Sequence, residues 1–522
     1  MNESNLSQTG ESLDLFSALA DKRYLVLGAG ISGRAAAAAL HHLGAAVSVI
    51  DGKAEQLDLL EPGMTPLLAG DPAAMLDALA LAGPDVVIAS PGFPPHHPVL
   101  ALAASRGIPI WSEVELAWRI APAGIRWIGL TGTNGKTTTV SMGSTILTSA
   151  GMVAPAVGNI GDPVTTTVLK AREGGGQLDA LALELSSFQL HFTSSMALTA
   201  AACLNIADDH LDWHGSRAQY EAAKGRIYTG VSARAVYNAQ DETTHRLASA
   251  AQRGTGAVLH GFTLQEPSQG QSGVIGRELV EADDHGSAVL ASLDDLNGVA
   301  ITGADGVARV PDHMVANALA AAALTRSVIG PDAVRSGLRS FTAGGHRFEL
   351  VAQIDGVAYV NDSKATNAHA AAAALASVAD GTAVWIAGGL AKGARLEELV
   401  ARNAAKLRAA VVIGIDQRPI LEALATQAPT VPVIVIDPAT SDVMNAVIAQ
   451  ASRLALSGDT VLLAPACASM DQFASYADRG VRFAAAVRTE SARVETARAE
   501  SARSESTPTT RVGQPAPEEN AP

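Results

Sequence analysis

Residues 129–138 read Gly-Leu-Thr-Gly-Thr-Asn-Gly-Lys-Thr-Thr, a glycine-rich run that ends in a Lys-Thr pair. The short apolar run at 125–128 predicts a buried strand, and the residues from 139 to 147 fit a helix with one apolar face. A strand, a glycine turn and a Lys-Thr pair opening a helix is the arrangement of a phosphate-binding loop. The strict pattern has a glycine where this chain has Leu130, and Gly132 supplies the turn instead. We therefore predict a nucleoside triphosphate site here.

Each part of this loop has a chemical role in that interpretation. Lys136 would reach the β- and γ-phosphates, and the Thr137 hydroxyl would bind Mg²⁺. The plainer alternative is an ordinary turn between a strand and a helix. The remaining residues predicted to surround the phosphates are Gly132, Thr133, Asn134, Gly135 and Thr138.

Length, composition and charge limit the class of protein. A chain of 522 residues with 48% hydrophobic and 17% charged residues is typical of a globular protein with roughly three domains. A net charge of −15 argues against a general nucleic-acid binder. Cys203 and Cys467 have no paired spacing, so we expect neither a disulfide scaffold nor cysteine-bound zinc. Residues 1–21 lack a signal-peptide pattern and no apolar run is long enough to span a membrane, so we expect a cytoplasmic protein.

The segment up to residue 117 predicts a second nucleotide-binding element. A buried strand at 23–27 runs into Gly28-Ala-Gly-Ile-Ser-Gly33, a helix follows at 34–43, and a strand at 46–50 ends at Asp51. This is a Rossmann-like βαβ unit, whose acid would take a ribose or a base edge. Alone it suggests an NAD-dependent oxidoreductase. A separate triphosphate site downstream instead favours an enzyme that uses ATP on a nucleotide-linked substrate.

The segment 118–343 carries candidate metal ligands. Glu184 lies near the end of a predicted strand, before two serines and Gln189, so coordination of Mg²⁺ is credible. Asp208, Asp209 and His210 follow another buried strand and form an oxygen and nitrogen ligand set, with surface charges on a loop as the alternative. Composition alone does not distinguish Lys224 from a solvent-facing lysine.

The segment 344–487 predicts a third α/β unit. A glycine pair at 344–345 indicates a hinge, and strands near 359–361 and 384–388 end in polar or glycine-rich loops, with Lys392 just beyond the second. From residue 488 the sequence follows a five-residue cycle of Arg and Glu, which builds no apolar stripe. We therefore expect residues 488–522 to form a solvated or disordered tail without a catalytic role.

Seven motifs, in this order, resemble the Mur ligases of bacterial cell-wall synthesis, over about residues 20–487. The motifs are Thr131-Gly-Thr-Asn-Gly-Lys-Thr, Glu184-Leu-Ser-Ser-Phe-Gln-Leu, Asp209-His-Leu-Asp, Ala222-Ala-Lys, His346-Arg-Phe-Glu, Asn361-Asp-Ser-Lys-Ala-Thr-Asn and Pro465-Ala-Cys-Ala-Ser-Met-Asp-Gln. The resemblance implies an α/β protein of three domains. They are a Rossmann-like domain for the UDP substrate at 1–117, a P-loop ATPase-like domain at 118–343 and a Rossmann-like amino-acid-binding domain at 344–487.

The resemblance also implies an activity. ATP would phosphorylate the L-alanine carboxylate of UDP-N-acetylmuramoyl-L-alanine, and the amine of D-glutamate would attack the acyl phosphate, in peptidoglycan precursor synthesis. A monomer without nucleic acid or membrane partners is expected. The alternatives are a sister Mur ligase or folylpolyglutamate-type synthetase that adds another amino acid, an NAD-dependent oxidoreductase, and a non-catalytic nucleotide sensor.

By the same resemblance, Lys136 and Thr137 would hold phosphates and one Mg²⁺ shared with Glu184. A second Mg²⁺ would lie between His210 and a carbamylated Lys224, with Lys392 near the reacting centre. The expected contacts with adenine, ribose or phosphate are Asn159, Asn317, Arg347 and Asp362. The expected UDP contacts are Gly30, Ile31, Ser32, Asp51 and Gly52. The remaining expected substrate contacts, the D-glutamate pocket included, are Ser186, Gln189, Lys364, Thr366, Ser469, Met470 and Tyr476. Three departures from the family pattern are Met314, where an amide is expected, Tyr476, where phenylalanine is usual, and the turn at 389–392, which lacks the acid often found there.

Overall fold

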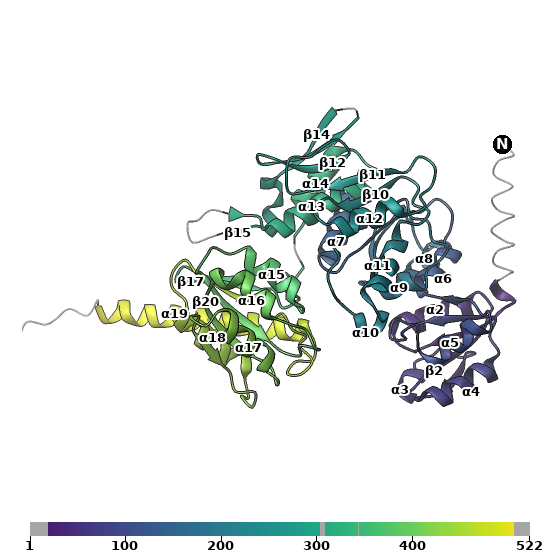
Figure 1. Cartoon of the computed structure of the whole chain (residues 1–522), viewed down its shortest axis with the longest axis horizontal. Helices are drawn as coiled ribbons and strands as arrows, with labels where there is room; N and C mark the ends of the chain where they lie inside the picture. The colour runs from purple at the N-terminus through teal and green to yellow at the C-terminus, as the bar shows by residue number, and fades with distance from the viewer. Residues whose placement is uncertain (1–18, 285, 303–307, 343, 506–522) are drawn as a thin grey trace, which may run out of the picture. The chain divides into compact units, whose positions relative to one another are not determined.

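The chain is built around three large β-sheets (Figure 1). The computed structural model describes residues 19–284, 286–302, 308–342 and 344–505. The chain divides into two units, the first comprising 1–300 and 310–342 and the second 301–309 and 343–522. The first unit holds two of the large sheets and the second unit holds the third. A short hairpin of β15 (Ile301–Thr302) and β16 (Ala308–Arg309) groups with the second unit.

The first sheet is parallel throughout, and β1 lies at its centre. Alternate residues of a strand face opposite sides, so Tyr24 and Val26 join one core while Leu25 and Leu27 join the other. The strands, in sheet order, are β3 (Thr65–Leu68), β2 (Ala46–Asp51), β1 (Arg23–Leu27), β4 (Val86–Ala89) and β5 (Ile110–Trp111). The helices are α2 (Ile31–His42) and α6 (Glu113–Ile120) on one face, α4 (Pro72–Ala82) and α5 (Pro98–Ser105) on the other, and α3 (Ala54–Leu57) after β2.

The second sheet has nine strands, with β6 between β8 and β9. In sheet order they are β14 (Gly286–Ser292), β13 (Glu278–Asp283), β12 (Gln271–Ile275), β11 (Val258–Phe262), β10 (Arg234–Asn238), β9 (Ala200–Cys203), β6 (Arg126–Thr131), β8 (Ala180–Glu184) and β7 (Ala156–Gly158). Strands β7 to β12 are parallel and β12 to β14 form an antiparallel meander. The helices are α7 (Lys136–Ser149), α8 (Val164–Arg172), α9 (Ser187–His191), α10 (Leu211–His214), α11 (Arg217–Gly225), η1 (Arg226–Tyr228), α12 (Glu242–Ala250), η2 (Leu293–Val299), α13 (Asp312–Thr325) and α14 (Pro331–Ser340).

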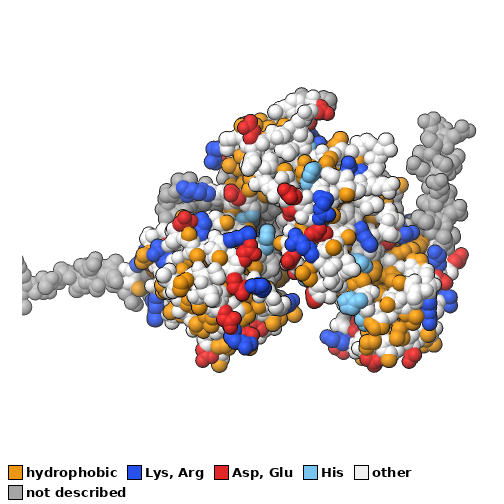
Figure 2. Space-filling model, viewed as in Figure 1, with side chains coloured by type: hydrophobic (Ala, Val, Ile, Leu, Met, Phe, Trp, Pro, Cys, Tyr) orange, Lys and Arg blue, Asp and Glu red, His pale blue; other side chains and the backbone are white. Residues whose placement is uncertain are grey.

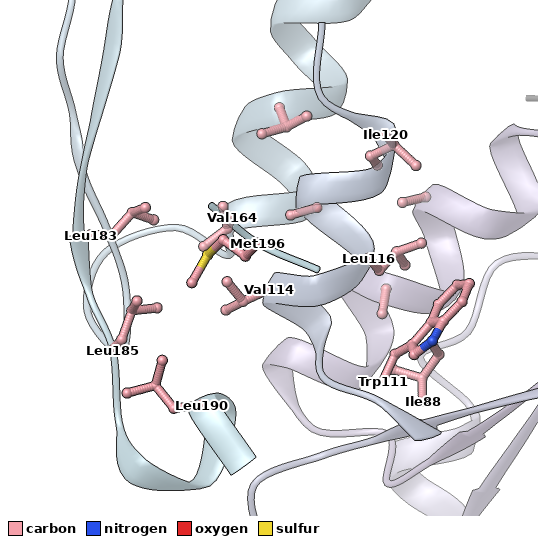
Figure 3. Packing of buried hydrophobic residues seen from close by; sticks show 14 of the residues in the cluster. Ile88, Trp111, Val114, Leu116, Ile120, Val164, Leu183, Leu185, Leu190 and Met196 are labelled. Atoms are coloured by element: carbon pink, nitrogen blue, oxygen red, sulfur yellow. The ribbon is translucent and has the colours of Figure 1, made fainter. Parts of the chain in front are cut away.

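One hydrophobic core joins the first two sheets. Figure 3 shows Val114 and Leu116 of α6 beside Val164 of α8, with Leu183 of β8 on the far side. Polar contacts cross the same interface, because the buried carboxylate of Glu113 accepts hydrogen bonds from the backbone N–H and the hydroxyl of Thr165, at 2.6 and 2.7 Å. The first two sheets are therefore packed into one unit.

The third sheet pairs β17 antiparallel to an otherwise parallel set. In sheet order its strands are β17 (Glu349–Ile354), β18 (Val357–Asn361), β22 (Thr460–Leu463), β19 (Ala383–Gly388), β20 (Leu407–Ile413) and β21 (Val433–Val435). Its helices are α15 (Ala368–Ala376), α16 (Glu397–Asn403), η3 (Ala404–Lys406), α17 (Arg418–Gln427), α18 (Val443–Leu454) and α19 (Tyr476–Glu505). Helix α19 continues past residue 487, where the tail was predicted to begin. Phe483, Val487 and Val494 pack against the core along one side of this helix. The rest of the predicted tail, 506–522, lies outside the described residues.

The predicted α/β class and the Rossmann-like first sheet are confirmed. The predicted domain limits at residues 117, 343 and 487 remain predictions. Within the described residues, no helix is both long and apolar enough to cross a membrane. On the face drawn in Figure 2, Lys and Arg side chains lie among Asp and Glu side chains and do not gather into one basic surface.

Candidate active site

The loop between β6 and α7 requires its glycines. Gly132 and Gly135 have φ values of +152° and +79°, which favour glycine. A Cβ atom on Gly135 would lie 2.5 Å from Oδ1 of Asn317, so this position also lacks space for a side chain. The ammonium of Lys136 donates hydrogen bonds to the carbonyl oxygens of Gly132 and Thr133, at 2.9 and 2.8 Å. The positive charge of Lys136 is therefore held against the backbone of its own loop.

Lys224 of α11 brings a second ammonium to the same loop. Its side chain is 2% exposed and donates to the Gly132 carbonyl at 2.8 Å and to the Thr131 hydroxyl at 3.2 Å. Its nitrogen also lies 4.9 Å from the centre of the Tyr220 ring. Burial, and then the charge of Lys136, lowers the pKa of Lys224 to about 7. The structure thus distinguishes this lysine from a solvent-facing one, which composition could not do.

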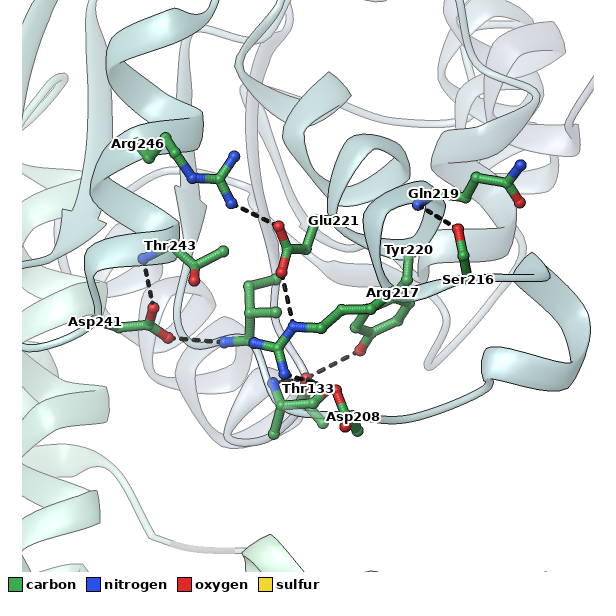
Figure 4. A network of polar contacts seen from close by, with 12 residues as sticks. Thr133, Asp208, Ser216, Arg217, Gln219, Tyr220, Glu221, Asp241, Thr243 and Arg246 are labelled. Atoms are coloured by element: carbon green, nitrogen blue, oxygen red, sulfur yellow. Dashed lines mark hydrogen bonds and ion pairs between the residues drawn. The ribbon is translucent and has the colours of Figure 1, made fainter.

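Two residues that the sequence analysis missed hold the phosphate loop in place. The Tyr220 hydroxyl lies 2.9 Å from the Thr133 hydroxyl, and Asn205 Oδ1 accepts a hydrogen bond from the Asn134 N–H at 2.8 Å. Figure 4 shows the Tyr220–Thr133 contact within a network of charged and polar side chains. Asn205 comes two residues after β9, so its place at a strand end was a usable signal, whereas Tyr220 gave none.

Glu184 is the residue that best fits a cation. It ends β8, and its Oε1 accepts a hydrogen bond from Nδ2 of Asn159 at 2.8 Å. Its other oxygen, Oε2, is buried and has no hydrogen-bond partner among the described residues. A buried carboxylate oxygen without a donor is costly unless it binds a cation or another group. Asn159, predicted to contact the nucleotide, here orients Glu184.

His210 stands before α10 in an unusual backbone conformation. Its φ is +51°, its Nε2 lies 3.5 Å from Oδ2 of Asp209, and its ring packs 4.9 Å from that of Phe188. Burial lowers its pKa, against the carboxylates of Asp209 and Asp212, which raise it. Among the described residues, no group of three or more His, Cys, Asp or Glu side chains gathers as a metal site. The predicted ligand set thus depends on a threonine hydroxyl and a modified lysine as well.

Two residues that the sequence analysis related to the nucleotide, Asn317 and Met314, lie on α13. Asn317 is nearly buried, and its Oδ1 accepts a hydrogen bond from the Thr139 hydroxyl at 3.1 Å. Met314, the departure from the expected amide, is 3% exposed on the same helix. Thr137 and Thr138 lie in the first turn of α7, and their contacts with phosphate remain predictions.

The glycine turn after β1 is braced differently. The carboxylate of Asp51 accepts hydrogen bonds from the N–H groups of Ala29 and Lys53, at 2.7 and 2.9 Å, so it holds the turn itself. A Cβ on Gly33 would lie 1.8 Å from the Gly28 carbonyl oxygen, so the helix can approach the strand only with glycine there. Around this turn, Gly30 caps α2, Ile31 is 71% exposed, Ser32 is half-buried, and Gly52 is exposed beside Gly70.

Contacts between the two sheets of the first unit connect this turn to the centre of the site. The Trp213 indole N–H donates to the Pro91 carbonyl at 3.1 Å, and its ring lies 4.5 Å from that of Phe188. Ser186 and Gln189, predicted substrate contacts, form a capping box at the start of α9 and bond to each other.

In the second unit, the predicted amino-acid pocket is carried by loops at one end of the third sheet. Asn361 and Leu463 are paired at the ends of β18 and β22, so the loops that follow them are neighbours. The Lys364 ammonium lies 4.0 Å from the centre of the Tyr476 ring. Thr366 donates its N–H to the Lys364 carbonyl at 2.8 Å.

The other residues predicted in this unit lie in the same set of loops. Ser469 is buried and Met470 is 71% exposed, and Lys392, with φ of +52°, follows the Leu390–Ala468 bridge. Asp362 Oδ1 accepts a hydrogen bond from the Phe348 N–H at 3.2 Å, and burial raises the pKa of Asp362 to about 7 against the effect of Arg347.

Two family models match this chain. The Mur ligase middle domain matches residues 130–325, and the Mur ligase glutamate ligase domain matches residues 346–467. The UDP-N-acetylmuramoylalanine–D-glutamate ligase of Streptomyces avermitilis is 48% identical over 90% of this chain and 98% of its own length. That of Streptomyces coelicolor is 46% identical over 90% and 98%.

A solved structure shares the fold. The UDP-N-acetylmuramate–alanine ligase of Thermotoga maritima matches with a TM-score of 0.50 and 17% identity, over 90% of this chain and all of its own. At that identity the likeness concerns the fold alone, while the Streptomyces relatives are similar over nearly the whole sequence. The chain belongs to the Mur ligases, and within them to the UDP-N-acetylmuramoylalanine–D-glutamate ligases.

Proposed function

We propose that this protein uses ATP to join D-glutamate to UDP-N-acetylmuramoyl-L-alanine, in peptidoglycan precursor synthesis. The observation that carries the proposal is the 48% identity to a ligase of that name over 98% of its length. A cytoplasmic, monomeric enzyme, as predicted from the sequence, is part of the proposal.

The chemistry is the activation of a carboxylate that is otherwise a poor acyl donor. The terminal P–O bond of ATP breaks, and the L-alanine carboxylate takes the phosphoryl group to form an acyl phosphate and ADP. The amine of D-glutamate then forms the C–N bond, loses a proton, and phosphate leaves. Both steps depend mainly on positioning and on neutralising negative charge. Lys136 supplies that positive charge from the loop itself.

Two Mg²⁺ ions are part of the proposal, and the structure supports a ligand role for Glu184. Magnesium would neutralise phosphate oxygens during transfer, and the unpartnered Oε2 of Glu184 supports a ligand role for that residue, beside Thr137. His210 and Lys224 are proposed to hold the second ion. Lys136 and Lys224 both donate to the Gly132 carbonyl, so two like charges crowd one oxygen. Carbamylation of Lys224 would replace that repulsion with a carboxylate suited to a metal.

The remaining assignments extend the proposal to the other ligands. Lys392 would act near the reacting centre, and Ser186 and Gln189 near the muramoyl substrate. The proposed ATP contacts beyond the phosphate loop are Asn159, Asn317, Arg347 and Asp362. The proposed UDP contacts are Gly30, Ile31, Ser32, Asp51 and Gly52. The proposed D-glutamate contacts are Lys364, Thr366, Ser469, Met470 and Tyr476.

A phosphate-release assay with omission controls tests the activity. The purified full chain should release phosphate from ATP only when UDP-N-acetylmuramoyl-L-alanine and D-glutamate are both present. Release with L-alanine or a diamino acid in place of D-glutamate would favour a sister ligase and overturn the assignment. Binding of NAD without ATP turnover would favour the oxidoreductase alternative.

A further inference from the structure

The second unit contains a buried arginine without a carboxylate partner. Arg479, in the first turn of α19, is 0% exposed. Within the part of the chain that the structure describes, no carboxylate forms an ion pair with it. Moving a charge out of water without an opposite charge beside it is strongly unfavourable. The contacts of Arg479 must offset that cost.

The guanidinium joins two loops that are far apart in the sequence. Its Nε donates to the Ser363 hydroxyl at 2.9 Å, and one terminal nitrogen donates to the Ser363 carbonyl at 2.9 Å. Both terminal nitrogens reach the Cys467 carbonyl, at 3.2 and 3.3 Å. The planar fork of arginine satisfies these acceptors together, which the single ammonium of lysine cannot do.

These two loops carry the residues proposed to bind D-glutamate. Ser363 directly precedes Lys364, and Cys467 lies two residues before Ser469. The Ser363 hydroxyl donates to the Tyr476 carbonyl at 2.8 Å, and the Tyr476 ring lies beneath the Lys364 ammonium.

A backbone contact joins the same loops. The Ala466 N–H donates to the Ala365 carbonyl at 2.9 Å, with Ala466 held at a φ of +61°. Arg479 therefore contacts both of the loops proposed to bind D-glutamate.

The charge of Arg479 acts on the pocket as well. Burial lowers its pKa only to about 10, so the guanidinium stays charged at neutral pH. Asp471 forms no ion pair with it among the described residues, and an oxygen of that carboxylate accepts the Ile415 N–H at 2.9 Å. A buried charge is screened far less than a surface charge, so Arg479 adds to the field of Lys364. A ligand with two carboxylates gains from that field more than a ligand with one.

We propose that Arg479 is a positioning and specificity-determining residue of the amino-acid pocket. It fixes the Ser363–Lys364 and Cys467–Ser469 loops, and its unpaired charge favours an acceptor amino acid with an acidic side chain over a neutral isostere. This inference rests on the proposed function, and it extends that function to a residue that does not itself touch the substrate.

Steady-state kinetics on Arg479→Met and Arg479→Lys test the inference. The phosphate-release assay is run with D-glutamate and with D-glutamine, its neutral isostere. We expect Arg479→Met to raise KM for D-glutamate about 10- to 100-fold, with KM for ATP and for the UDP substrate unchanged. The preference for D-glutamate over D-glutamine in kcat/KM should fall in the same variant. Arg479→Lys should raise KM but keep the preference, because it keeps the charge.

Arg482→Met is the matched control. Arg482 lies one turn further along α19, where it is 60% exposed and paired with Asp478, so its loss should leave KM for D-glutamate unchanged. A folded Arg479→Met protein whose KM for D-glutamate stays within about twofold of the parent value would overturn the positioning role. A raised KM with unchanged preference would overturn the charge role.

A second variant covers the case in which Arg479→Met does not fold. Ser363→Ala removes only the hydroxyl between Arg479 and Tyr476, and it should raise KM for D-glutamate about threefold. An unchanged KM in that variant would overturn the inference. A parent protein that releases no phosphate with all three substrates would instead overturn the proposed function, so the two failures are distinguishable.

Discussion

The two glycine turns of the first unit, at residues 28–33 and 132–135, both join a parallel strand to a helix but differ in the charges that brace them. At the first turn, Asp51 accepts the Ala29 N–H while Arg34 donates to the Ala29 carbonyl, so the bracing charges are opposite in sign. At the second, Lys136 and Lys224 both donate to the Gly132 carbonyl. We proposed a nucleotide at each turn, and the charges of the contacting side chains should influence how much negative charge each turn can hold.

The largest expected effect comes from removing the positive charge of Lys136 from the second turn. Lys136→Met should lower turnover by about a thousandfold or more, because a phosphoryl group in transfer loses the positive charge proposed to neutralise it. Phosphate release with all three substrates measures it. Lys170→Met, at an exposed lysine of α8 in the same unit, is the control and should keep parental activity. Turnover within tenfold of the parent would show that the loop does not depend on Lys136.

Lys224 sharpens the comparison, because its charge is proposed to be reversed in the active enzyme. Lys224→Ala should lower turnover about a hundredfold, with partial recovery in the presence of small carboxylates that occupy the vacated space. Lys224→Arg keeps the positive charge and forms no carbamate, so it should be similarly inactive. Full activity of Lys224→Arg in the phosphate-release assay would remove the carbamate from the proposal.

Loss of the Asp51 carboxylate should affect only the first turn. Asp51→Asn weakens two charge-assisted hydrogen bonds to backbone N–H groups and should raise KM for the UDP substrate about tenfold, with KM for ATP unchanged. Asp85→Asn is the control, because that carboxylate accepts a backbone N–H at the opposite end of the same sheet. A parallel rise in KM for ATP would mean that the two turns are not independent.

The smallest expected effect concerns an uncharged group that contacts the second turn, the hydroxyl of Tyr220. Tyr220→Phe removes the hydroxyl in contact with Thr133 and should raise KM for ATP about threefold, consistent with a net loss of about 1 kcal/mol. Tyr228→Phe also removes a buried hydroxyl, one bonded to Cys203 and Val236, and should lower stability in urea unfolding without changing KM. Equal effects of the two variants on KM would argue against a specific role for Tyr220.

The fold class could be predicted, because in parallel sheets the loops after the strands gather at one edge. Glu184 and Lys364 were singled out at or just after the end of a buried strand, and their roles in the site remain predictions. Partners brought in from distant helices could not be predicted, since nothing in the local sequence of Tyr220 or Arg479 indicates Thr133 or Ser363. Residues 488–522 were predicted to form a solvated or disordered tail, and α19 extends through that stretch to Glu505, with Val494 packed against the core of the third sheet.

The left-handed backbone of His210, Lys392 and Ala466 has a consequence for adaptation to heat. Each non-glycine residue in that conformation costs about 1 kcal/mol, and glycine would relieve the strain. Ala466→Gly removes only a methyl group, so selection for thermal tolerance can act there freely. At His210 and Lys392 the same relief would delete a side chain proposed for catalysis. Tolerance of heat and speed of turnover therefore pull in opposite directions at those two positions, and these are the places where a heat-adapted relative should have kept its strain.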